Sequence, residues 1–130
     1  MSCFWDSLIK SVKNEDLDIY FDNKNFKINP HNFVTILKNI NKHTTNILWN
    51  NTLLSKQMLE ENVEAINNYD VNQVQNGYYC STCDPFLFLL SEYLNIIIIH
   101  NYNNNIMTYS PQINSRYTIK ISSDNGHCWC

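Results

Sequence analysis

The feature that most constrains this chain is a change of hydrophobic period between Phe86 and His100. Phe86–Leu94 is apolar on nearly all sides of a helix, which predicts a buried helix. Ile96–His100 follows as a short apolar run rich in β-branched residues, which predicts a central strand. Both elements need other parts of the chain to cover them. With 130 residues and 44% hydrophobic side chains, the chain is expected to build one domain around this pair.

Helical spacing dominates the sequence before this pair. A helix is predicted over Cys3–Val12, with Ser2 as its N-cap, because apolar residues recur every three to four positions. Pro30 is expected to open a second helix, and a third is predicted from about Leu53 to Asn68. Asn14–Asn29 is interpreted as a polar, turn-rich connection, and Trp49 as part of an irregular stretch.

Strand-like alternation dominates the sequence after this pair. Strands are predicted over Ile106–Tyr109, Tyr117–Ser122 and His127–Cys130, with a turn at Asp124-Asn125-Gly126. Asp84-Pro85 is expected to cap and begin the buried helix. The predicted fold class is therefore α+β: a compact single domain over residues 1–130, with N-terminal helices packed on a small, mostly antiparallel sheet.

Charge and hydropathy exclude several classes of partner. Charged residues make up 16% of the chain, the net charge is −3 and Arg116 is the only arginine, so a nucleic-acid partner is not expected. The apolar runs are too short to span a bilayer, and the first residues do not resemble a signal peptide. We therefore expect no membrane association, a cytoplasmic location and five cysteines that stay reduced.

Cys3 and His127 are the residues best suited to chemistry. A cysteine in the first turn of a helix lies at the positive end of the helix dipole, where the thiolate is favoured. A nucleophilic cysteine also needs a base, and a histidine on a strand beside that helix supplies one. By spacing alone, however, a buried thiol and an ordinary strand histidine are the better explanation, because any cysteine and any histidine make such a pair.

Three segments resemble the OTU-like (ovarian tumour) cysteine peptidases. Cys3–Ile9, with the sequence CFWDSLI, resembles the helix that carries their catalytic cysteine. Cys83–Ile98 is similar to their helix followed by a central strand, and Ile119–Trp129 to their closing strand, turn and catalytic histidine. The segments occur in the family's order and cover most of the chain. The composition of the chain, which is rich in Asn and Ile, is similar to that of OTU-like proteins of large DNA viruses.

The resemblance implies a papain-like, OTU-like fold and a thiol hydrolase that removes ubiquitin or a ubiquitin-like modifier from conjugates. Cys3 would be the nucleophile and His127 the general base, and backbone N–H groups of Ser2 and Cys3 would bind the oxyanion. Asp124 and Asn125 are the candidates for the third catalytic residue. No metal or organic cofactor is expected, and a viral enzyme of this kind would act in the host cytoplasm.

Two departures from the family pattern leave a second interpretation open. Only Met1 and Ser2 precede Cys3, whereas the family usually has a loop there that helps to form the oxyanion hole. Trp129 stands two positions after His127, where it cannot orient an imidazole as a carboxylate does. The alternative is an inactive OTU-like module that binds ubiquitin or a host protein without cutting.

A third interpretation uses the remaining cysteines as metal ligands. Cys80, Cys83, Cys128 and Cys130 form a C-x-x-C pair and a C-x-C pair that could hold a tetrahedral zinc ion. His127 could take the place of one thiolate as a zinc ligand, and it would then not be available as the general base of the peptidase. The two hypotheses therefore exclude one another at His127.

Overall fold

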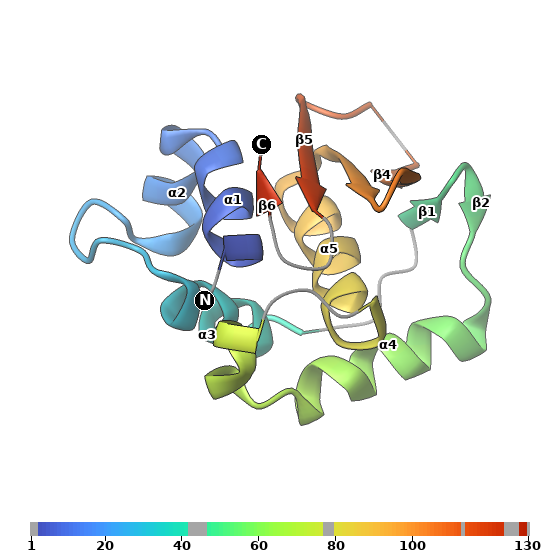
Figure 1. Cartoon of the computed structure of the whole chain (residues 1–130), viewed down its shortest axis with the longest axis horizontal. Helices are drawn as coiled ribbons and strands as arrows, with labels where there is room; N and C mark the ends of the chain where they lie inside the picture. Colours follow the sequence, from blue (N-terminus) through green and yellow to red (C-terminus); the bar gives the residue numbers. More distant parts are fainter. Residues whose placement is uncertain (1–2, 42–46, 77–79, 113, 124–127, 130) are drawn as a thin grey trace.

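The computed structural model describes residues 3–41, 47–76, 80–112, 114–123 and 128–129 (Figure 1). It confirms an α+β architecture in which helices pack on one sheet. The described residues form five α-helices and one 3-10 helix, η1, at Val71–Asn76. The α-helices are α1 (Cys3–Ser11), α2 (Asn14–Phe21), α3 (Pro30–Asn39), α4 (Lys56–Asn68) and α5 (Cys80–Leu94).

Local capping explains where two of these helices begin. The Asn29 side chain accepts a hydrogen bond from the Asn32 N–H at 2.9 Å, and Pro30 occupies the first turn of α3, as the sequence predicted. Ser55 caps α4 in the same way through the Met58 N–H at 3.1 Å. The third helix therefore begins after Ser55, and the prediction that it begins near Leu53 is wrong.

Two further helix predictions need correction. The segment interpreted as a turn-rich connection contains α2, whose buried Leu17 and Phe21 anchor it to the core. The buried helix begins at Cys80, so Asp84 and Pro85 lie inside it and do not form its cap. Pro85 removes one intrahelical hydrogen bond, but it lies near enough to the start of α5 for the helix to continue.

The six strands form one mixed sheet in the order β2-β1-β4-β3-β5-β6. β3 and β5 are parallel, and every other neighbouring pair is antiparallel, so the sheet is mostly antiparallel as expected. The apolar run is confirmed as a central strand, β3. The strands are β1 (Ile47–Trp49), β2 (Thr52–Leu53), β3 (Ile97–Tyr102), β4 (Asn105–Pro111), β5 (Thr118–Ser123) and β6 (Cys128–Trp129).

Two hairpins in the sheet turn on pairs of asparagines. Asn50 and Asn51 join β1 to β2, and Asn103 and Asn104 join β3 to β4, all with positive φ. Asparagine tolerates this region better than other residues with a Cβ, and two such residues match the type I′ turn of a tight hairpin. The Asn50 side chain also accepts a hydrogen bond from the Thr108 N–H at 2.8 Å. Trp49 therefore lies in a strand, which corrects the prediction of an irregular stretch there.

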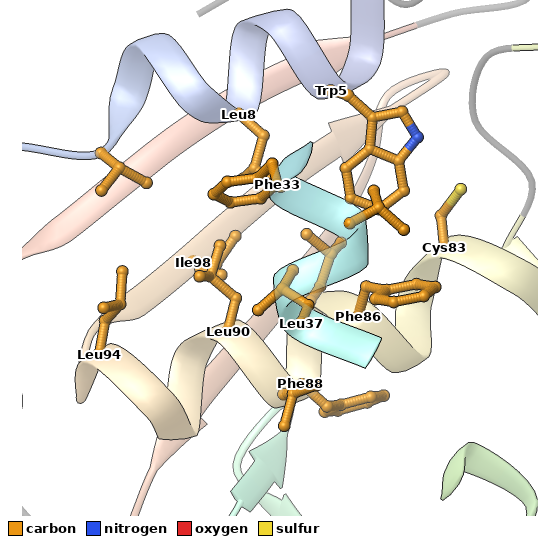
Figure 2. Packing of buried hydrophobic residues seen from close by; sticks show 14 of the residues in the cluster. Trp5, Leu8, Phe33, Leu37, Cys83, Phe86, Phe88, Leu90, Leu94 and Ile98 are labelled. Carbon is orange, nitrogen blue, oxygen red and sulfur yellow. The ribbon is translucent and has the colours of Figure 1, made fainter. Parts of the chain in front are cut away.

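The helices cover one face of the sheet. Pairing places Ile98 beside Tyr109 on one side and Ile119 on the other, and all three are buried. The alternate residues, such as Ile99 and Lys120, point to the opposite face and are half-buried or exposed. α1 and α5 contact the sheet, and α3 packs against both of these helices. Trp5, Phe33, Leu37, Phe86 and Leu90 interdigitate in the core between them (Figure 2).

No helix within the described ranges combines the length and the apolar character that a membrane crossing requires.

Candidate functional site

Helix α1 begins at Cys3 and is held against the sheet by its apolar stripe. Phe4, Trp5 and Leu8 are almost completely buried. The first backbone N–H groups of an α-helix have no partner within the helix, and the helix dipole adds partial positive charge at this end. The backbone of Cys3 therefore occupies the position that was predicted for the nucleophile. Its side chain lies outside the described part of the structure.

The other end of the chain reaches the same helix. β6 pairs with β5 through Ser123 opposite Cys128 and Ser122 opposite Trp129. Helix α1 packs against both β5 and β6, and Figure 1 shows β6 beside α1. The helix that begins at Cys3 and the strand that directly follows His127 thus belong to one packed unit. Ser2, Asp124, Asn125 and His127 themselves lie outside the described residues.

A buried polar pair, His100 and Ser123, lies between these segments. The His100 Nε2 and Ser123 Oγ atoms are 2.7 Å apart, and both residues are buried. The His100 ring packs against Phe4, with ring centroids 5.5 Å apart, and more distantly against Tyr102. Burial lowers the pKa of His100 to about 4, so the imidazole is neutral at pH 7.

The predicted strand ends at His100, and the structure corrects this boundary. β3 continues to Tyr102, so His100 lies inside a central strand and faces the helices. A signal for it exists in the sequence. His100 stands two residues after Ile98, and Ser123 stands two residues after Ile121, so both are polar residues on the apolar side of a period-2 pattern. Polar residues at core positions are frequently functional.

A second polar cluster ties α2 to the start of β5. The Arg116 Nη2 atom donates to Asp16 Oδ2 at 2.8 Å, and Arg116 Nε donates to the Leu94 carbonyl at 2.9 Å. The Tyr117 hydroxyl donates to the same Asp16 oxygen. Burial and this hydrogen bond raise the pKa of Tyr117 to about 12, so it stays a donor at all ordinary pH values. The only arginine of the chain thus has a structural role.

The predicted zinc ligands are only partly described. Cys83 is buried near Trp5 and Phe86 in the core (Figure 2). Among the side chains that the structure describes, no three His, Cys, Asp or Glu residues come together as a metal site would require. The side chains of Cys80 and Cys128, and all of Cys130, lie outside that part. The zinc hypothesis therefore stays a prediction.

Two surface hollows lie on other parts of the molecule. One, of about 330 Å³, lies beside α3 and includes Phe26 and Ile36, and the other, of about 290 Å³, includes Trp49, Met58 and Phe88. The residues that line them come from α2 to α5, their connections and β1, and not from α1, β5 or β6. Neither hollow therefore extends the arrangement around α1.

The fold and this arrangement define the chain as a mixed-sheet α+β protein whose N-terminal helix packs against its C-terminal strands. No family model, no curated protein and no solved structure matches it.

Proposed function

We propose that the chain is a thiol-dependent hydrolase that removes ubiquitin or a ubiquitin-like modifier from conjugates. Cys3 is the nucleophile and His127 the general base. The observation that carries the proposal is the packing of α1, which begins at Cys3, against β6, which begins one residue after His127. The ordered resemblance of three segments to OTU-like peptidases supplies the reaction and the substrate class. A papain-like arrangement of the α+β fold belongs to the same proposal.

The proposed reaction uses groups of the chain alone. The Cys3 sulfur attacks the isopeptide carbonyl while His127 accepts the thiol proton, and backbone N–H groups of Ser2 and Cys3 bind the oxyanion. Collapse of the tetrahedral intermediate breaks the C–N bond, and His127 returns the proton to the leaving lysine amine. Water, deprotonated by His127, then hydrolyses the thioester and releases the modifier with a free carboxylate. Thiol chemistry of this kind suits the cytosol, where cysteines stay reduced.

A ubiquitin probe with a thiol-reactive electrophile at its C-terminus tests the proposal. The intact chain is expected to form a covalent adduct at Cys3 and to cleave ubiquitin chains, and Cys3→Ala is expected to abolish both. Cys83→Ala is the matched control, because it removes a buried core thiol and should leave labelling intact. His127→Ala should also abolish cleavage.

The same experiment separates the alternatives. If the chain binds ubiquitin measurably but forms no adduct, the hydrolase proposal is wrong and the inactive binding module replaces it. Stoichiometric zinc in the purified protein, lost together with folding when Cys128 and Cys130 are replaced by serine, would assign His127 and its neighbours to a metal site and would also exclude the hydrolase.

A further inference from the structure

The His100–Ser123 pair is more polar than its position requires for stability. Both residues face the helices in a core whose neighbouring positions on the same strands are Ile98 and Ile121. Burying an imidazole and a hydroxyl costs free energy that their mutual hydrogen bond only offsets, and replacing both partners by apolar groups is often neutral or stabilising. A gain in stability is therefore not a sufficient reason for two polar groups to meet here.

The pair lies where the two parts of the proposed site join. On one side the His100 ring contacts Phe4, which directly follows Cys3. On the other side Ser123 ends β5, pairs with Cys128, and accepts the Asn103 N–H at its carbonyl at 3.1 Å. One buried hydrogen bond of 2.7 Å thus links a residue packed on the first turn of α1 to the strand end that leads to His127 and β6.

We propose that His100 and Ser123 are positioning residues that hold the first turn of α1 and the β5–β6 pair in register, so that Cys3 and His127 meet. This inference rests on the proposed function. The hydrogen bond fixes the Ser123 side chain relative to central strand β3, and the ring contact fixes Phe4 relative to the same strand. Because His100 is neutral at pH 7, the pair adds no charge to the packing between α1 and the sheet. A small misplacement of reacting groups costs far more rate than stability.

The test measures the reactivity of Cys3 as a function of pH in folded variants of the whole chain. Iodoacetamide is the probe, and peptide mapping by mass spectrometry assigns the rate to Cys3. Ser123→Ala is expected to slow alkylation at pH 7 by about ten-fold or more and to move the reactive pKa toward that of an ordinary thiol, near 8.5. Loss of a partner that orients a metal ligand has an effect of this size. Ser123→Thr retains the hydroxyl and should restore the rate.

Ser91→Ala is the matched control. The Ser91 hydroxyl is also buried and donates to the Ile96 carbonyl at 2.6 Å, just before the opposite end of β3. Its loss should lower the free energy of unfolding as much as the loss of the Ser123 hydroxyl, while the rate of Cys3 alkylation stays at that of the unchanged protein. A purely structural pair would make the two variants alike in both measurements.

Each outcome decides the inference. Slow alkylation of Cys3 in the unchanged protein, at the rate of an ordinary thiol, overturns the proposed function and the inference with it. Fast alkylation there, with Ser123→Ala and Ser91→Ala equally reactive, overturns the inference alone. If Ser123→Ala does not fold, the double variant His100→Leu with Ser123→Ala fills the site with apolar groups. It is expected to fold and to lose the fast alkylation, and if it keeps that rate the inference is wrong.

Discussion

At the scale of single residues, His100 shows how the core sets a protonation state. The pKa of an exposed histidine is 6.5, and burial lowers that of His100 to about 4 because the charged imidazole loses its hydration. Phe4, Tyr102 and Ser123, which contact this imidazole, are uncharged at neutral pH. The folded protein therefore excludes a proton that the unfolded chain binds.

The stability of the protein should consequently depend on pH in a defined window. Well above pH 6.5 neither state protonates His100, so its contribution is fully present. As the pH falls through 6.5 toward 4, the unfolded chain gains a proton that the folded protein does not. Full titration corresponds to about 3 kcal/mol of lost stability, at 1.36 kcal/mol per pKa unit. Urea unfolding between pH 4 and pH 7 measures this loss.

Two variants test whether His100 causes this pH dependence of the free energy of unfolding. His100→Gln removes the titrating group and should flatten this part of the pH dependence, whereas His31→Gln, at an exposed position, should leave it unchanged. A slope that persists in His100→Gln would contradict the assignment.

At the scale of elements, the sequence predicted those whose apolar pattern repeats over several turns. α1, α3 and α5 have buried stripes that local periodicity shows, and β3 begins with a continuous apolar run. α2 could not be predicted in this way, because it contains a buried carboxylate. Asp16 can be buried there because Arg116, which lies far along the chain, donates a hydrogen bond to it. β1 has three residues, too few for a period to show.

The candidate site, too, could be predicted from the sequence only in part. The helix that begins at Cys3 and the strand near Cys128 were predictable from local patterns. The role of His100 was not, because it depends on a parallel pairing between β3 and β5 and on the ring of Phe4 above it. Sequence spacing contains no information about either contact.

The Asn103-Asn104 turn gives a prediction for a hairpin. Asn104 has a φ of 67°, a conformation that costs a residue with a branched Cβ about 1–2 kcal/mol. Asn104→Val should therefore lower the free energy of unfolding by about that amount, and Asn104→Gly should keep or raise it. Thermal and urea unfolding measure both.

The control for this turn is Thr118→Val, which places valine at an exposed position of a regular strand. It should change the free energy of unfolding by less than about 0.5 kcal/mol. Equal effects of valine at positions 104 and 118 would show that backbone conformation does not limit residue 104.

At the scale of the whole molecule, Trp5 is the point where separate elements of the core meet. Its ring lies edge-on to Phe86 of α5, with ring centroids 5.5 Å apart, and near Phe33 of α3 (Figure 2). It also contacts the ring of Tyr69, which follows α4. Tyr69 and Phe86 contact one another at 5.1 Å, which closes the cluster. One side chain of α1 thus joins three other parts of the chain.

Trp5→Ala should therefore destabilise the entire fold. Removing a buried tryptophan costs about 3–5 kcal/mol, a large part of the roughly 5–15 kcal/mol that stabilises a domain. Urea unfolding followed by circular dichroism measures the loss. Ile19→Ala is the control, because Ile19 is 72% exposed and should contribute little. A loss below about 1 kcal/mol for Trp5→Ala would contradict a central role for this cluster.

The contact between α1 and β6 joins two segments that lie far apart in the sequence, since α1 ends at Ser11 and β6 begins at Cys128. Ribosomes add about 5–20 residues per second, so α1 is synthesised on the order of ten seconds before the strand that packs against it. During that interval the nascent chain can offer part of the apolar stripe of α1 to chaperones and to other chains. The arrival of β6, and not the formation of the helix, is therefore the event that completes this packed unit.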